Sequence, residues 1–170
     1  DVESYLTAGD TILIDAGNYL EVDTCTIDTN GVFVIGVDSA LTVIDFNDTT
    51  AANRKGVYSK GRSGLTLRDF AVVRGYRGVW LANVSASSVT RVRSDTNGQY
   101  GFHLDSGTNL VTLAATTASG NASTGYRLQT ATSNALTGNV ARANAFIGFL
   151  LNSSSASNTL TGNIASGHAQ

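Results

Sequence analysis

Gly78-Val-Trp-Leu81, Gly101-Phe-His-Leu104 and Gly125-Tyr-Arg-Leu128 repeat one pattern, in which a glycine precedes an apolar residue, a variable residue and a second apolar residue. Related copies begin at Gly31, Gly56 and Gly148, so the pattern returns every 22 to 25 residues. A repeat of this length, built from short alternating segments, is typical of a solenoid in which each repeat stacks on its neighbours.

A second alternating run follows each glycine pattern and carries threonine in its second place. These runs begin at Leu41, Leu65, Val89, Val111, Leu136 and Leu160. Threonine suits an outward position on a strand between inward apolar residues. No glycine-free window of a dozen residues has the apolar spacing of a helix. The sequence therefore predicts an all-β fold, a single-stranded parallel β-helix of about seven coils that forms one domain over residues 1–170.

Stacking of the coils aligns residues of equal phase in vertical columns. Two inward columns are expected, one formed by Val32, Val57, Val79, Phe102, Tyr126 and Phe149, the other by Val34, Ser59, Leu81, Leu104, Leu128 and Leu151. Asn109, Asn134 and Asn158 recur at a similar spacing just before a strand. Stacked side-chain amides at a bend can bond to one another and to turn backbone, so these three residues predict an asparagine ladder.

The composition excludes several classes of protein. The chain has 18 glycines, no proline and one cysteine, and only 14% of its residues are charged. Cys25 alone makes neither a disulfide framework nor a metal cluster, and we interpret it as a small buried apolar residue. No apolar run reaches the roughly 18 to 20 residues that span a bilayer, so no membrane partner is expected.

Charge is sorted along the chain, although the net charge is only −2. Ten of the 13 acidic residues lie in residues 1–48, and nine of the 11 basic residues lie between Arg54 and Arg93. In a linear stack this order gives an acidic end and a basic middle. The basic middle is either solvated surface or a region for anion binding or head-to-tail assembly. Nucleic acid is an unlikely partner, because the net charge is negative and no recognised motif occurs.

Several segments resemble a known superfamily. Ala8-Gly9-Asp10-Thr11 with the strand pattern after it, Leu41-Thr-Val-Ile-Asp45, and Asn158-Thr-Leu-Thr-Gly-Asn-Ile-Ala165 are similar to coils of the pectin-lyase-like right-handed parallel β-helix superfamily. The later coils resemble the carbohydrate-binding repeats of NosD-type proteins and alginate epimerases. The resemblance implies right-handed winding, a polysaccharide partner, a secreted or cell-surface location and a short N-terminal cap within residues 1–10. It does not imply one activity, because the superfamily includes lyases, hydrolases, epimerases, tailspikes and scaffolds.

Two outward columns are the candidate functional surface. The variable residues of the pattern are Phe33, Tyr58, Trp80, His103, Arg127 and Leu150, and the residues before each glycine are Asn30, Lys55, Arg77, Tyr100, Thr124 and Ile147. Rings stack on sugar faces, and arginine pairs with carboxylate or sulfate. Phe33, Lys55, Tyr58, Trp80 and Asp105 are therefore predicted to bind substrate along the stack. The alternative is that the rings stack across strands only for stability.

A uronate lyase or C5-epimerase needs a cation, a base and an acid. Arg77 or Arg127 is the predicted cation, an exposed His103 the base, and Tyr100 the acid. Glycosidases of the superfamily carry paired acids where this chain has Tyr100 and His103, which argues against a hydrolase. No cofactor is expected, and the exposed columns lack the carboxylate cluster that calcium would need.

A non-catalytic structural role is the competing interpretation. The last coil has no recognisable cap and leaves Phe146, Ile147 and Leu150 near an open edge. Open strand edges favour stacking. The sequence therefore also fits a tailspike-like trimer, a homo-oligomer joined end to end, or a piece of a longer protein with further coils.

Overall fold

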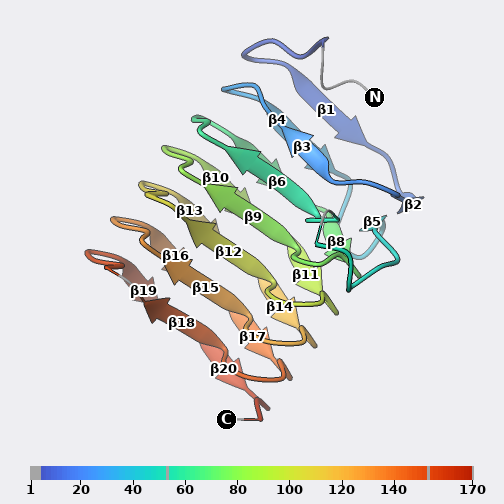
Figure 1. The fold of residues 1–170 in the computed structure, drawn as a ribbon. Helices are drawn as coiled ribbons and strands as arrows, with labels where there is room; N and C mark the ends of the chain where they lie inside the picture. Colours follow the sequence, from blue (N-terminus) through green and yellow to red (C-terminus); the bar gives the residue numbers. More distant parts are fainter. Residues whose placement is uncertain (1–4, 53, 153, 170) are drawn as a thin grey trace.

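The computed structural model describes residues 5–52, 54–152 and 154–169, which wind through three parallel sheets (Figure 1). Sheet A contains β1 (Thr11–Ile14), β4 (Phe33–Gly36), β7 (Thr66–Arg68), β10 (Ser88–Thr90), β13 (Thr112–Ala114), β16 (Ala135–Thr137) and β19 (Thr159–Thr161). Sheet B contains β2 (Gly17–Leu20), β5 (Thr42–Asp45), β8 (Ala71–Val73), β11 (Arg93–Asp95), β14 (Thr117–Ser119), β17 (Val140–Arg142) and β20 (Ile164–Ser166). Sheet C contains β3 (Cys25–Ile27), β6 (Val57–Lys60), β9 (Val79–Ala82), β12 (Phe102–Asp105), β15 (Tyr126–Gln129) and β18 (Phe149–Asn152).

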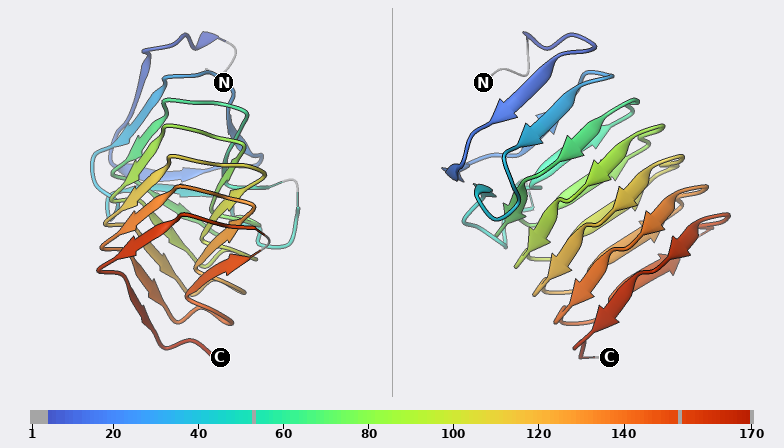
Figure 2. Two further views of the ribbon diagram at one scale, coloured as in Figure 1. Left: turned by 90° about the vertical axis from the view of Figure 1, so that its left-hand side faces the viewer. Right: turned by 180° about the vertical axis from the view of Figure 1, so that it is seen from behind.

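The chain visits the sheets in the constant order A, B, C, and each strand pairs in parallel with the equivalent strand of the next coil. Seven coils result, stacked from the N-terminal to the C-terminal end (Figure 2). The predicted fold class, an all-β single-stranded parallel solenoid, is confirmed. No helix in the part of the chain that is described is long and apolar enough to span a membrane.

One left-handed residue marks the bend between sheets A and B in five successive coils. Each such residue has φ between 50° and 64° and directly follows a sheet A strand. The residues are Asp69, Arg91, Ala115, Gly138 and Gly162. Only two are glycines, so stacking holds non-glycine residues in a sparsely populated conformation.

The core consists of inward columns that run the height of the stack. Val57, Val79, Phe102, Tyr126 and Phe149 are in register on sheet C, as predicted. The ring of Tyr126 stacks between those of Phe102 and Phe149, with centroids 4.9 and 4.6 Å away. Its hydroxyl is satisfied by Oγ1 of Thr116 at 3.0 Å. Each fully buried apolar side chain of this kind contributes about 1.5–3 kcal/mol.

The predicted asparagine ladder is partly confirmed. Nδ2 of Asn134 donates to Oδ1 of Asn158 at 3.0 Å. Asn109 is outside this ladder and instead donates to the carbonyl oxygen of Gly107. Two further ladders occupy the other bends, one formed by Asn97, Asn121 and Asn144, the other by Asn139 and Asn163.

The column predicted for the first glycine pattern, which begins at Gly31, is wrong. Phe33 lies in sheet A, where it pairs with Thr66, and the sheet C strand of this part of the chain is β3. Val32 and Val34 are buried as expected but line sheet A rather than the predicted columns. Thr42 also departs from the prediction, since it begins a sheet B strand and is fully buried. Its hydroxyl is satisfied there, accepting from the backbone N–H of Val37 at 3.0 Å.

A long loop between β5 and β6 explains why the Gly31 pattern lies in sheet A although its spacing predicted sheet C. Val34 pairs with Leu67, 33 positions on, whereas Leu67 pairs with Val89, 22 positions on. The loop projects from the stack and runs down its side (Figure 2). It is anchored by the backbone N–H of Asp48, which donates to the carbonyl oxygen of Arg74 at 2.9 Å.

The predicted N-terminal cap lies partly in residues 1–4, outside the described residues. Leu6 packs against the core, beside a hollow of about 800 Å³ in the first coils. The hollow is lined largely by inward residues such as Ile12, Ile14 and Ile44, so it continues the core toward the N-terminal end.

Candidate binding surface on sheet C

The outer face of sheet C brings together most of the predicted site residues. Tyr58, Trp80, His103 and Arg127 occupy one register column, preceded in that column by Thr26. The strands that carry them lie side by side in Figure 1. We define the cation–ring surface as Lys55, Tyr58, Arg77, Trp80, Tyr100, His103 and Arg127. Asp105 ends the strand that carries His103, and Phe33 lies on another sheet.

Lys55 lies over two rings at the N-terminal part of this surface. Its Nζ is 4.4 Å from the ring centroid of Tyr58 and 5.2 Å from that of Trp80. The two rings are themselves in contact, with centroids 4.9 Å apart. The backbone N–H of Lys55 donates to Oγ1 of Thr24 at 3.0 Å, which fixes the end of the long loop above these rings.

Arg77 occupies the next position along the stack. Its Cζ lies 4.0 Å from the ring centroid of Trp80 and 5.5 Å from that of Tyr100, and its Nε donates to Oε1 of Gln99 at 2.9 Å. Burial lowers the pKa of the Arg77 guanidinium from its ordinary value. Arginine nevertheless stays charged at every pH relevant here, so this partly desolvated cation favours a nearby anion.

Arg127 and Tyr100 form the next pair. The guanidinium of Arg127 donates to the Tyr100 hydroxyl, and its Cζ is 4.8 Å from the centroid of the Tyr100 ring. The Arg127 Nε is buried without a partner among the described residues. The Nε1 of Trp80 is in the same state. Two hydrogen-bond donors of this surface are therefore unused.

His103 is buried, not exposed as predicted. The residue retains 2% of its accessible surface, because the Trp80 ring stacks on the imidazole at 5.6 Å and the Tyr100 ring lies edge-on at 5.0 Å. Burial, helped by the positive charge of Arg77, lowers the pKa of His103 to about 4. The imidazole is therefore neutral at neutral pH, with one donor and one acceptor nitrogen.

Asp105 is the carboxylate nearest in sequence to this surface. Its Oδ1 accepts from the backbone N–H of Ser106 at 2.7 Å, and the side chain is half-buried. Burial, and then the charge of Asp105, raise the pKa of the Tyr58 hydroxyl. No group of three or more His, Cys, Asp or Glu side chains within the described ranges could hold a metal ion.

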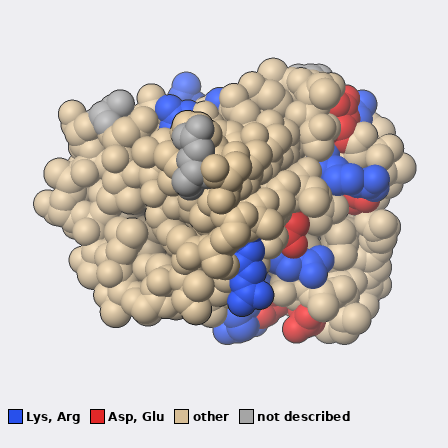
Figure 3. Space-filling model, turned by 90° about the horizontal axis from the view of Figure 1, so that it is seen from below, with Lys and Arg blue, Asp and Glu red and all other residues tan. Residues whose placement is uncertain are grey.

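The remaining arginines of the basic middle are mostly neutralised by carboxylates on the same or the neighbouring coil. Arg74 pairs with Asp45, Arg91 with Asp69 at 2.6 Å, and Arg93 with Asp95 at 3.0 Å. Arg54 and Arg68 are paired as well. Figure 3 shows blue and red groups side by side on one flank of the molecule. Across the residues that the structure describes, Lys55, Arg77 and Arg127 have no carboxylate within 4.0 Å.

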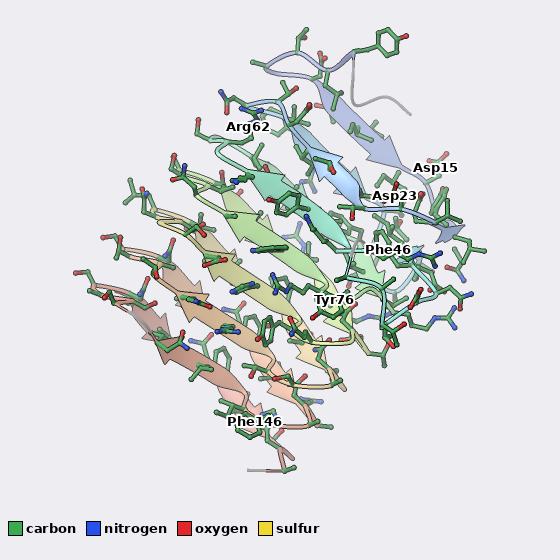
Figure 4. All side chains as sticks on the ribbon, viewed as in Figure 1. Asp15, Asp23, Phe46, Arg62, Tyr76 and Phe146 are labelled. Carbon is green, nitrogen blue, oxygen red and sulfur yellow. The ribbon has the colours of Figure 1, made fainter. Side chains whose placement is uncertain are left out.

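Three residues of this region were not predicted. Gln99 orients Arg77, Gln129 lies close enough to His103 to raise its pKa slightly, and Tyr76 is 5.7 Å from the Arg77 guanidinium. Figure 4 shows Tyr76 at the side of sheet C where its strands begin. Tyr76 and Gln99 stand two residues before a glycine of the repeat, so extending the column alignment by one position would have found them.

This arrangement suits an extended anionic ligand with flat apolar faces. The half-buried rings of Tyr58 and Trp80 can stack on sugar faces, whereas Tyr100, which was predicted to point outward, is buried like His103. Guanidinium groups bind carboxylates through paired hydrogen bonds. The surface spans four consecutive strands of sheet C, from β6 to β15. It therefore offers a series of similar contacts along the stack.

Solved structures of similar fold include carbohydrate-active enzymes. A provisionally assigned glycosyl hydrolase from Parabacteroides merdae is 9% identical, with a TM-score of 0.70 over 91% of this chain and 80% of that protein. A GH87 α-1,3-glucanase catalytic domain in complex with tetrasaccharides is 13% identical, with a TM-score of 0.71 over 93% of this chain. The chain spans only 36% of that glucanase structure. At these identities the likeness concerns the fold alone, and comparison with curated protein sequences finds no significant match.

A family model agrees with the structure over almost the whole chain. The model is described as the right handed beta helix region and matches residues 10–170. It therefore covers every coil of the stack and identifies the winding as right-handed. The family match and the shared architecture confirm the resemblance seen in the sequence: this chain is a member of the right-handed β-helix family.

Proposed function

We propose that the cation–ring surface binds an anionic polysaccharide, of the uronate class, lying along the stack at the cell surface or outside the cell. One observation carries the proposal. Lys55, Arg77 and Arg127 are partly buried on one face without carboxylate partners, whereas Arg74, Arg91 and Arg93 on the flank of the stack are each paired with an aspartate. A ligand carboxylate would form ion pairs with these cations, and the adjoining rings would bind the sugar faces.

Lyase or C5-epimerase activity on the same polymer is the second candidate. It is favoured by the Arg127–Tyr100 hydrogen bond beside Arg77, because a phenol next to two cations is suited to proton transfer near a neutralised carboxylate. The predicted assignment of His103 as base and Tyr100 as acid requires that ligand binding uncover His103.

Assembly through the stack ends is the structural alternative. Phe146, Leu151 and Leu160 are exposed in the last coils (Phe146 is labelled in Figure 4). Sedimentation analysis over a concentration series separates this alternative from glycan binding. A mass that grows with concentration and no affinity for any uronan would favour assembly.

Trp80 provides the direct test of binding, because it is the only tryptophan in the chain. Titration with oligogalacturonate should change the Trp80 fluorescence, and the affinity should fall as salt rises because the contacts are ionic. The same oligosaccharide with its carboxyl groups reduced should bind far more weakly. Equal affinity for the charged and reduced forms would refute an anion-directed site.

Arginine variants locate the site. Arg77→Gln and Arg127→Gln should each weaken binding by roughly 10- to 100-fold, equivalent to about 1.5–3 kcal/mol for a hydrogen bond to a charged group. Arg142→Gln is the matched control, since Arg142 is exposed on sheet B. A loss in the control equal to that in the two site variants would show a merely non-specific charge effect.

A further inference from the structure

His103 is an anomaly within the cation–ring surface. It occupies the outward column of sheet C, yet the residue is only 2% exposed. Neither imidazole nitrogen makes a hydrogen bond of good geometry among the described residues, and the side chain of Gln129 on the same face interacts with it only weakly. Buried polar groups are nearly always well paired, so an imidazole with no well-formed hydrogen bond at either nitrogen needs an explanation.

Trp80 stacks on one side of His103, and two other residues beside the imidazole, Tyr100 and Arg127, are joined by a side-chain hydrogen bond. The Tyr100 ring lies edge-on to the imidazole at 5.0 Å, and Arg127 stands opposite His103 on the neighbouring strand. Arg127 and Tyr100 are joined by the bond from the guanidinium to the phenol oxygen. This bond uses a neutral acceptor, although a carboxylate is a stronger and bidentate partner for arginine.

We infer that Tyr100 and Arg127 form a lid over His103 that the acid group of the ligand opens, and that His103 then hydrogen-bonds to sugar hydroxyls beside that acid group. The inference rests on the proposed binding of an acidic polysaccharide. The carboxylate takes over the Arg127 guanidinium, Tyr100 is released, and the imidazole gains a partner for its donor and its acceptor nitrogen. The site therefore selects an acidic sugar whose neighbouring hydroxyls are free.

The low pKa of His103 agrees with this role. A neutral imidazole offers one donor and one acceptor, which matches a pair of vicinal hydroxyls. The groups facing His103 are Arg77, Arg127, Asp105 and Gln129, and the first two disfavour its protonated form.

The lid can be tested first without any ligand. His103 and His168 are the only histidines in the chain, so modification by diethyl pyrocarbonate can be followed at each by mass spectrometry. His103 should react slowly in the native protein, and Tyr100→Phe should raise its rate several-fold relative to His168. Tyr76→Phe is the control, because Tyr76 lies on the same side of the sheet next to Arg77, and it should leave the ratio unchanged. An unchanged ratio in Tyr100→Phe would overturn the lid.

The second test uses oligogalacturonate and reads the imidazole nitrogens by ¹⁵N NMR. Binding should shift the nitrogen resonances of His103 and leave those of His168 in place. Binding detected by Trp80 fluorescence without that shift would overturn the lid and leave the proposed function intact. Absence of any binding would overturn both.

Selectivity gives the third measurement. His103→Phe keeps a ring in the column and should weaken binding of oligogalacturonate roughly 5- to 10-fold, in line with the loss of about one hydrogen bond. Binding of the O-acetylated oligosaccharide, which lacks free hydroxyls, should be weaker in the native protein and nearly unaffected by His103→Phe. Equal losses for both ligands would show a structural role for His103 and refute the contact.

Discussion

Nδ2 of Asn121 donates to Oδ1 of Asn144 at 2.9 Å, and the backbone N–H of Asn121 donates to the same oxygen at 3.0 Å. Asn97 makes the same two bonds to Asn121 from the coil before. The final member is a histidine, since Nδ1 of His168 accepts from the backbone N–H of Asn144 at 3.2 Å. Each side chain thus satisfies buried backbone at the bend and a neighbour in the next coil.

Asn121→Ala should therefore lower the free energy of unfolding by about 1–3 kcal/mol or more, because it leaves buried donors without acceptors. Asn109→Ala is the control. Asn109 makes a single side-chain bond within its own turn, so the loss should be about 1 kcal/mol or less. Denaturant unfolding followed by circular dichroism measures both. Equal effects would mean that the ladder adds nothing beyond a local bond.

Leu128→Ala tests the inward column of sheet C. Leu128 is fully buried, and truncation should cost about 2–5 kcal/mol through lost burial and the cavity left behind. Leu13→Ala changes the same side chain where it is 74% exposed, and it should have little effect. The prediction is wrong if the two variants unfold at the same denaturant concentration.

Low pH should lower the free energy of unfolding, because it protonates the carboxylates of the ion pairs on the flank of the stack. The Arg91 guanidinium beside Asp69 holds the pKa of that carboxyl below its usual value of about 3.9. A lowered folded-state pKa contributes stability above the unfolded-state value, and that stability is lost as pH falls through the folded-state value. Asp69→Asn should reduce stability at neutral pH and flatten its decline below about pH 4. Asp15→Asn, at an exposed position outside the ion pairs, should keep the native pH profile.

Gly98→Ala tests how the long loop is held. A Cβ at Gly98 would lie 1.7 Å from the carbonyl oxygen of Thr49, so the loop must move away. Trypsin should then cleave faster after Arg54 and Lys55. At Gly17 the three atoms nearest to a Cβ would belong to the Tyr19 side chain, at 3.3 Å or more, so Gly17→Ala serves as the control. Unchanged cleavage in Gly98→Ala would show that Thr49 is not held there.

Column positions were predictable wherever the coil length was constant. Trp80, His103 and Arg127 stand 23 and 24 positions apart and fall in register, so their neighbourhood followed from spacing alone. The column predicted for Phe33 was wrong for a specific reason. The long loop lengthens one coil, and the Gly31 pattern then stands 25 residues before Gly56 although it belongs to a different sheet. A repeat interval cannot distinguish one regular coil from a partial coil plus an inserted loop.

The spacing of the repeats in the sequence could not predict that His103 is buried. Its outward direction was predicted correctly, but its exposure depends on how the neighbouring side chains, from the same and the adjacent coil, lie against it. Trp80 reaches the imidazole from the neighbouring strand of sheet C, one coil earlier, and Tyr100 reaches it from the residues just before the strand of His103. The cross-coil ion pairs were likewise invisible in the charge pattern, since Asp69 and Arg91 meet only after one complete turn.

The equal rise of the coils makes the protein a potential molecular ruler. Neighbouring strands of sheet C are about 4.8 Å apart, so the contacts from β6 to β15 extend over roughly 14 Å. Apart from the long loop between β5 and β6, whose Thr49 lies against Gly98 two coils further on, the coils contact their direct neighbours. Inserting a duplicate of one coil would therefore lengthen the reach by a fixed increment, and preference for longer oligosaccharides would rise in steps with the number of coils.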